Sequence, residues 1–180
     1  MPDSTNASHV YPLSEFYGRA GRALPPVELI PGEAVPEPYR SLLVHANDMT
    51  PTLEAFHEDH VHLEILHRVR RGDFYFRQVI LRLVRDERPV EFGANKIYVG
   101  RFPEDLRELI LADDVPLGRI LRDFQLPHVT EARAFLRVQS DDIMGAAFEL
   151  NGPTTLYGRK AVISDLQGRP LSEIVEILPP

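Results

Sequence analysis

An arginine within an apolar strand is the feature that most constrains this chain. Residues 74–84 alternate with the period of two expected for a strand, and Arg77 lies in this run. Its neighbours on the same face are all apolar or aromatic: Tyr75, Val79, Leu81 and Leu83. Because a buried guanidinium without a partner is very costly, the row requires either an acidic partner inside the protein or an anionic ligand. The pattern by itself leaves both interpretations open.

The composition predicts one ordinary globular domain. The 180 residues suffice for a hydrophobic core, and the net charge of -7 argues against a general nucleic-acid-binding surface. The absence of cysteine excludes disulfides, thiolate catalysis and cysteine-based metal sites. The first ten residues lack the features of a secretory signal, and no run reaches the roughly 18 apolar residues of a membrane span. We therefore expect a cytoplasmic protein without membrane or nucleic-acid partners, either a monomer or a weak oligomer.

The order of patterns along the chain predicts an α+β fold. Residues 1–38 are rich in proline, which favours an N-terminal arm or wrapping segment with at most one short helix at residues 14–23, before a domain at 39–180. Period-two patterning predicts about six strands, at 61–69, 74–84, 89–99, 134–139, 155–165 and 171–178. Helical spacing predicts helices at 38–45, after Thr50 as N-cap, at 104–110, at 114–121 and at 141–150. We expect a single antiparallel sheet with helices on one face.

The last strand supplies acidic candidates for a partner of Arg77. Residues 171–178 alternate so that Glu176 lies on one face and Glu173 on the other, and periodicity does not choose between them. With Glu176 as the candidate, one interpretation is a structural ion pair. The other is a site for a ring carboxylate, in which Arg77 binds the carboxylate through two parallel hydrogen bonds and the glutamate exchanges a proton with a hydroxyl.

Two other groups of residues are weaker candidates for a functional site. His60 and His62 share a strand face at a spacing that suits a metal, but so short a motif more commonly lies in a solvated segment, and we expect no metal. Leu117 and Gly118 follow Pro116 at the start of a short helix, where free peptide N–H groups bind anions. The sequence contains no Walker loop, no dinucleotide-binding fingerprint and no recognisable nucleophile motif.

Five stretches, taken in order, resemble the chorismate pyruvate-lyase family. They are LLVHANDMT at 42–50, FRQV at 76–79, PLGR at 116–119, LYGR at 156–159 and EIVEILPP at 173–180. The similarity runs from about residue 40 to the end and is greatest to the branch with a Glu-Ile-Leu-Pro-Pro tail. It implies an elimination that cleaves chorismate into 4-hydroxybenzoate and pyruvate without cofactor or metal, and that supplies a hydroxybenzoate for biosynthesis.

The resemblance also implies roles for individual residues. By motif position, Arg77 and the backbone amide of Leu117 would hold the ring carboxylate, and Glu176 would meet the ring hydroxyl. The residues that correspond to site-lining positions are Met49, Thr50 and Arg159, of which Arg159 could face the enolpyruvyl carboxylate. The family buries its ligand under flaps, which here would come from residues 49–57.

One departure leaves the substrate open. Asn95 and Lys96 stand where an apolar strand would be the simplest choice, so the pocket could be more polar than the family implies, unless Lys96 faces solvent. The alternatives are a related enzyme, for example one that forms 3-hydroxybenzoate, and a non-catalytic small-molecule-binding protein related to the ligand-sensing domains of GntR-type regulators. Those regulators normally carry a DNA-binding helix-turn-helix, which residues 1–38 are too short and too proline-rich to supply, so we expect the enzyme.

Overall fold

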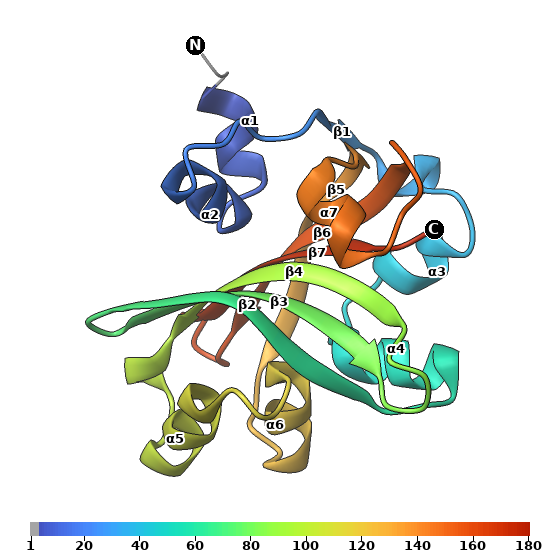
Figure 1. Ribbon diagram of the computed structural model, residues 1–180. Coiled ribbons are helices and arrows are strands. Elements are labelled where there is room, and N and C mark those ends of the chain that lie inside the picture. Colours follow the sequence, from blue (N-terminus) through green and yellow to red (C-terminus); the bar gives the residue numbers. More distant parts are fainter. Residues whose placement is uncertain (1–3) are drawn as a thin grey trace.

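The computed structural model describes residues 4–180 and contains a single antiparallel sheet in the order β1-β5-β6-β7-β4-β3-β2 (Figure 1). The seven strands are β1 (Val27–Ile30), β2 (Val61–Arg71), β3 (Phe74–Leu83), β4 (Pro89–Tyr98), β5 (Val129–Gln139), β6 (Thr155–Ser164) and β7 (Pro170–Leu178). The α-helices are α1 (Ser4–His9), α2 (Leu13–Arg19), α3 (Tyr39–Leu43), α4 (Met49–His57), α5 (Glu104–Ala112), α6 (Leu117–Asp123) and α7 (Asp142–Ala147). Two short 3-10 helices complete the described elements, η1 (Gly32–Ala34) and η2 (Val99–Arg101).

The expected α+β class and single antiparallel sheet are confirmed, with one strand more than the six that the pattern suggests. The additional strand is β1, which pairs with β5 at the edge of the sheet. The residues before it also add to the core, because α2 buries Leu13, Phe16 and Tyr17. The proline-rich segment is therefore packed against the sheet over its described part.

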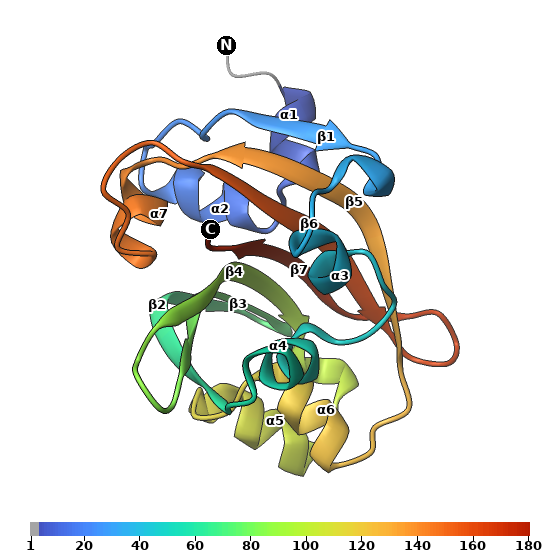
Figure 2. The same cartoon turned by 90° about the vertical axis from the view of Figure 1, so that its right-hand side faces the viewer.

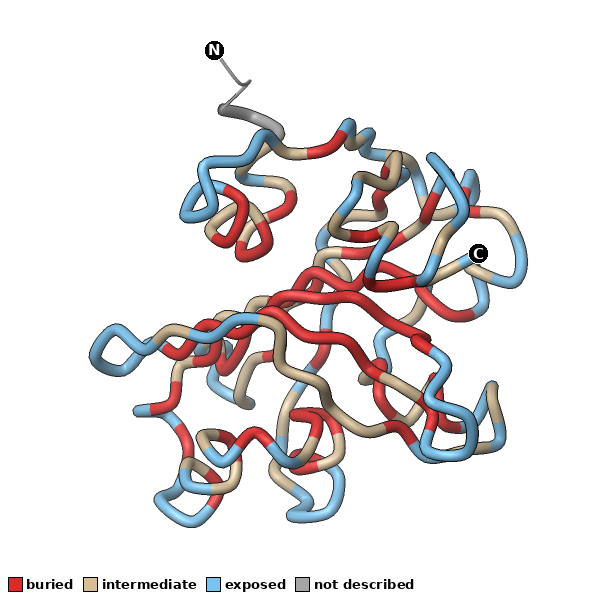
Figure 3. The backbone as a smooth tube through the Cα atoms, viewed as in Figure 1, coloured by how far each residue is buried: buried red, intermediate tan, exposed pale blue. Residues whose placement is uncertain are grey.

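Helices lie on both faces of the sheet rather than on one (Figures 1 and 2). One face of β3 and β4, with Phe76, Ile80 and Phe92, packs against α2 and α7. The opposite face packs against α3 to α6, in two clusters around Ile97 and Leu81. The central strands are consequently buried on both sides, as Figure 3 shows for the run of buried residues through the middle of the molecule. Among the described residues, no helix is long and apolar enough to cross a membrane.

A bulge in β2 changes which of its side chains face the α5 and α6 side. The register with β3 shifts between Ile65 and His67, so the strict alternation expected from Val61 to Val69 is broken. Val69 packs with the cluster on the α2 side, whereas Leu63 packs on the other. As a result Arg68 lies opposite Arg77 in the ladder and shares its face.

Candidate functional site

A small cavity lies between the sheet and the first turns of α4 and α6. Its volume is about 40 Å³. Side chains from the strands form its floor: Leu63, Arg77, Val79, Leu81, Glu91, Asn95, Thr130, Arg159, Ala161, Ile163, Ile174 and Glu176. Residues from the two helix starts close it: Asp48, Met49, Thr50, Pro116, Leu117 and Gly118.

The structure brings all six of the site residues named from the sequence to this one cavity. They are Arg77, Leu117, Glu176, Met49, Thr50 and Arg159. One local expectation for them is wrong, because Thr50 lies inside α4 and the N-cap position is taken by Asp48. Strands β3, β4 and β7 all contribute to the cavity because of their register. Gly93 of β4 pairs with Val79 of β3 on one side and with Glu176 of β7 on the other, so every second residue from these three positions faces the cavity side of the sheet.

Arg77 is paired with an acid, but not with the one expected. Its side chain is 1% exposed, and its Nη1 donates to Oδ1 of Asp113, the residue that ends α5, at 3.1 Å. The expected partner, Glu176, binds another arginine instead. Nε of Arg77 is buried and has no hydrogen-bond partner among the described residues. An unsatisfied buried guanidinium donor at a cavity wall marks a position where a ligand oxygen would be stabilised.

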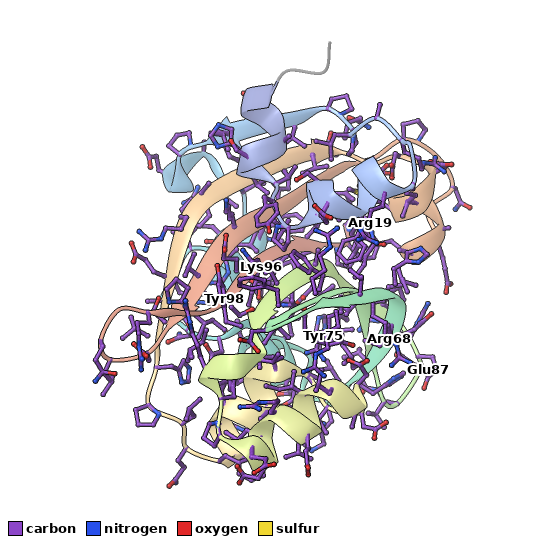
Figure 4. All side chains as sticks on the ribbon, turned by 90° about the vertical axis from the view of Figure 1, so that its left-hand side faces the viewer. Arg19, Arg68, Tyr75, Glu87, Lys96 and Tyr98 are labelled. Atoms are coloured by element: carbon purple, nitrogen blue, oxygen red, sulfur yellow. The ribbon has the colours of Figure 1, made fainter. Side chains whose placement is uncertain are left out.

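Asp113 collects two further donors. Arg68 donates to its Oδ2 at 2.8 Å, and the Tyr75 hydroxyl donates to the same oxygen. Figure 4 shows Arg68 and Tyr75 on the same side of the sheet, next to the α5–α6 segment. Burial and the hydrogen bond to Asp113 raise the pKa of Tyr75 to about 12, so its hydroxyl keeps its proton. One carboxylate thus serves two guanidinium groups, which leaves a local excess of positive charge.

Arg159 is fully committed to the protein rather than to a ligand. It is 0% exposed, and its Nε donates to Oε2 of Glu176 at 2.6 Å. Its terminal nitrogens donate to three backbone carbonyls before α4: those of Leu43, His45 and Asn47. The network ties the last two strands to the segment that leads into α4. A role in gripping a second ligand carboxylate would require Arg159 to give up one of these acceptors.

The two glutamates of the last strand are now distinguished. Glu176 is 5% exposed and lines the cavity, whereas Glu173 faces the other side of the sheet. There Glu173 accepts a hydrogen bond from Tyr98 at 2.6 Å and one from Lys96 at 3.5 Å. Lys96 also lies over the rings of Phe74 and Tyr98, and Figure 4 shows it beside Tyr98, on the sheet face away from the cavity. Of the two polar residues flagged on β4, only Asn95 therefore lines the cavity.

Glu91 is a cavity residue that the sequence did not single out. It is 5% exposed, and its Oε2 has no partner among the described residues. Burial, with repulsion from Glu176, raises its pKa well above the usual range, and Arg159 only partly opposes this. The signal available in the sequence was the row of alternate residues on β4, in which Glu91 and Asn95 flank Gly93.

The starts of α4 and α6 meet above the cavity. A Cβ at Gly118 would lie 2.9 Å from Oγ1 of Thr50, so glycine is what allows the two helices to approach this closely. Leu117 and Gly118 belong to the first turn of α6, where peptide N–H groups have no intrahelical acceptor. Further along α4, Glu54 accepts hydrogen bonds from Arg119 and Arg122 of α6. The middle of α4 is therefore fastened to α6.

A partly buried polar cluster holds the beginning of α4 to β5. Asp48 accepts a hydrogen bond from Nε2 of His128 at 2.8 Å and one from the Thr130 hydroxyl. Nδ1 of His128 lies 2.6 Å from the carbonyl oxygen of Leu126. Because both ring nitrogens face acceptors, the imidazole is best satisfied as the cation. The bond to Asp48 accordingly raises the pKa of His128, while burial would raise the pKa of Asp48 but the bonds from His128 and Thr130 lower it.

The shifts in this cluster predict a pH window for stability. The raised His128 pKa contributes stability below about pH 6.5 that is lost as the pH rises through the folded-state pKa, and the lowered Asp48 pKa contributes stability above about pH 3.9 that is lost on acidification. The free energy of unfolding lost on His128→Ala should therefore be largest between these limits and shrink above neutrality. Urea unfolding from pH 4 to 9 measures this.

A matched variant separates titration from packing. Thr130→Val removes the other hydrogen bond to Asp48 without removing a titrating group, so its cost should stay level from pH 5 to 9. If the cost of His128→Ala were equally level over that range, the charged Asp48–His128 pair would be ruled out.

The two histidines considered for a metal have other partners. Nδ1 of His60 lies 3.3 Å from Glu54, and Nε2 of His62 lies 2.8 Å from Glu87. Within residues 4–180, no group of three or more metal-ligating side chains is present.

The comparisons with known proteins find a shared fold but no match in sequence. No protein-family model and no curated protein matches the sequence. Among solved structures, a domain assigned as the ligand-binding domain of a GntR-family transcriptional regulator from Bordetella bronchiseptica is 14% identical, with a TM-score of 0.50 over 66% of this chain and 85% of that chain. A gene product of Staphylococcus aureus is 7% identical, with a TM-score of 0.55 over 76% of this chain and 90% of that chain.

These similarities establish the fold alone. A chain assigned as a transcriptional regulator from Bacillus subtilis is also similar, at 6% identity and a TM-score of 0.50, over 66% of this chain and 57% of that chain. The fold is thus that of GntR-family ligand-binding domains, which is also the fold of chorismate lyase. At these identities the likeness does not assign a ligand or a reaction.

Proposed function

We propose that this protein binds a small ring carboxylate in the cavity below α4 and α6, with Arg77 as the group that holds the carboxylate. The observation that carries the proposal is the unpartnered Nε of a fully buried guanidinium at the cavity wall. A carboxylate there would complete the hydrogen bonding of Arg77. The likeness to a domain described as ligand-binding supports the same conclusion.

The charges around the cavity suit an anion. Arg68 and Arg77 share the single carboxylate of Asp113, so an incoming anion meets an uncompensated positive charge. Leu117 lines the cavity, and its amide, which has no intrahelical acceptor, would be a second donor, as in the resemblance. The remaining wall is largely apolar, with Val79, Leu81 and Ile174 available to contact a ring.

Binding a ring requires the cavity to open. At about 40 Å³ it is far smaller than a typical ligand pocket, so part of its roof must move. A wider surface hollow, lined by Asn47, Asp48, His128 and Thr130 among others, adjoins it and shares Asp48 and Thr130 with it. Because Glu54 fixes the middle of α4, the movable part is its first turn, which the Asp48 contacts hold closed.

The test compares acids with matched neutral molecules. Calorimetric titration should show binding of 4-hydroxybenzoate and benzoate, and much weaker binding of 4-hydroxybenzamide, because the amide lacks the charge that Arg77 pairs with. Equal affinity for the acid and the amide would contradict a carboxylate site.

Cleavage of chorismate is the second candidate function. It is favoured by one specific observation, namely that Arg77, Leu117 and Glu176, the three residues matched to the lyase motifs, line the same cavity. The reaction breaks the bond between the ring and the enolpyruvyl oxygen, the ring loses a proton as it becomes aromatic, and the departing enolpyruvate gains a proton to become pyruvate. The site would contribute positioning and electrostatic stabilisation.

An activity assay distinguishes the two candidates. If the protein is a lyase, incubation with chorismate should release 4-hydroxybenzoate and pyruvate in equal amounts, and Glu176→Gln should fold normally but turn over more slowly. Glu173→Gln is the matched control, because Glu173 lies on the opposite face of the same strand and should leave turnover unchanged. If no product forms at high protein concentration although the acids bind, the protein is a binding protein and not a lyase.

A further inference from the structure

The Glu91 carboxyl leans along β4 toward the middle of the cavity. A Cβ at Gly93 would lie 3.1 Å from Oε1 of Glu91, so the carboxyl occupies the space above the glycine. Gly93 is the ladder partner of Glu176, and Arg159 is the partner of Glu176 on the other side. Glu91, although two residues further along its strand, thus brings its carboxyl into the row that contains Glu176.

The charges in this row do not balance if both glutamates are ionised. Nε of Arg159 donates to Glu176, and the terminal nitrogens of Arg159 bond to backbone carbonyls and the His45 ring. In the part of the chain that the structure describes, Glu91 has no cationic partner, and its Oε2 has no hydrogen-bond partner at all. A buried carboxyl in that position is stabilised by keeping its proton. Glu176 has Arg159 as its ion-pair partner, so Glu91 is the carboxyl of the two that lacks one.

We infer that Glu91 is a neutral carboxylic acid whose unpartnered oxygen carries a hydrogen-bond donor for the bound ligand, an inference that rests on the proposed binding of a ring carboxylate by Arg77. The ligand that fits has a hydroxyl at the end opposite its carboxylate. That hydroxyl would accept a hydrogen bond from Glu91 and donate one to Glu176. A hydroxyl is satisfied by this acid and carboxylate together, whereas a hydrogen atom or a methoxy group at the same place is not.

The spacing along the strands fits a six-membered ring that carries a carboxylate at one end and a hydroxyl at the other. Arg77 pairs with Asn95, and the row of Gly93 and Glu176 lies two residues further along the ladder. Two residues of strand correspond to about 6.7 Å. This is close to the separation of a carboxylate and a hydroxyl on opposite sides of a six-membered ring.

The experiment titrates 4-hydroxybenzoate and benzoate into the wild-type protein and two variants. Glu91→Gln keeps a neutral donor and should retain the preference for the hydroxy acid. Glu91→Leu removes the donor and should reduce that preference roughly two- to tenfold, the size of one neutral hydrogen bond, while benzoate still binds through Arg77. Glu173→Gln, on the opposite sheet face, is the matched control and should change neither affinity.

An infrared spectrum of the ligand-free protein at pH 7 tests the proton directly. The C=O stretch of a protonated carboxyl should be present in the wild type and in Glu173→Gln, and absent in Glu91→Gln. A wild type without that band would overturn the inference and leave the Arg77 site untouched. With the band present, equal binding of both acids to the wild type would overturn the ligand contact alone. If neither acid bound, the proposed function would fail and this inference with it.

Discussion

Arg77→Ala is expected to weaken the binding of 4-hydroxybenzoate by about 2 to 5 kcal/mol, or roughly 30- to 4000-fold. The loss should be large because Arg77 is 1% exposed, and a carboxylate bound there would lose its counter-ion in a desolvated site. Folding should survive, since Asp113 keeps its bonds from Arg68 and Tyr75. Calorimetric titration of the variant measures the change.

Arg68→Ala is the matched control for this experiment. It removes a guanidinium from the same Asp113 carboxylate, but its side chain is 62% exposed and does not line the cavity. The affinity for the acid should therefore fall much less than in Arg77→Ala, because Arg68 adds to the positive charge near the cavity without touching the ligand. Arg77→Lys adds a second comparison, because lysine keeps the charge but not the planar donor pair, and should fall between Arg77→Ala and the wild type. Wild-type affinity in Arg77→Ala would remove Arg77 from the site.

Arg159→Ala should be among the most destabilising single substitutions in the chain, at about 3 to 5 kcal/mol. The change leaves Glu176 buried without a counter-ion, next to Glu91, and deprives the Leu43, His45 and Asn47 carbonyls of a donor. With a typical free energy of unfolding of about 5 to 15 kcal/mol, such a loss would take a large share of the total. Urea unfolding at pH 7 measures it.

An exposed arginine on the neighbouring strand provides the comparison. Arg137 of β5 pairs with Glu28 of β1, and both side chains are about half exposed. Exposed pairs of this kind contribute little, because water screens them and the side chains lose entropy. If Arg159→Ala destabilised the protein no more than Arg137→Ala does, the Arg159 network would not be the element that fastens β6 and β7 to the start of α4.

Local periodicity predicted most of the fold. The alternation in residues 61–98 predicted the meander of β2, β3 and β4, since each strand is long and its turns are marked by glycine or proline. The stop signal at residues 151–153 and the tight turn at 165–170 likewise set the limits of the last two strands. In contrast, β1 is four residues long with an exposed centre, so it has no periodic signal and exists because it pairs with β5.

The partners of the buried charges could not be predicted in the same way. Asp113 reaches Arg77 from the end of a helix 36 residues away, and its position depends on how α5 packs against the sheet. The bulge in β2 turns Arg68 toward the same carboxylate, and a strict period of two cannot show such a shift. The family resemblance, rather than the pattern, pointed to Arg159, whereas Leu117 was indicated by both the helix-start pattern and the resemblance.

The choice among acidic residues shows the same limit. Periodicity placed Glu173 and Glu176 on opposite faces but did not say which face holds the cavity, because both are covered by helices. Glu91 was overlooked because a single glutamate in a strand usually faces water. Only the three-dimensional arrangement, with one arginine beside two buried carboxyls, distinguishes it.

A crystal structure of the protein soaked or grown with 4-hydroxybenzoate tests the central claim most directly. We predict that the carboxylate lies against Nε of Arg77, with the ring over Val79 and the hydroxyl between Glu91 and Glu176. The first turn of α4 should be displaced to make room. Electron density for the acid outside this cavity, or with its carboxylate turned away from Arg77, would contradict the account.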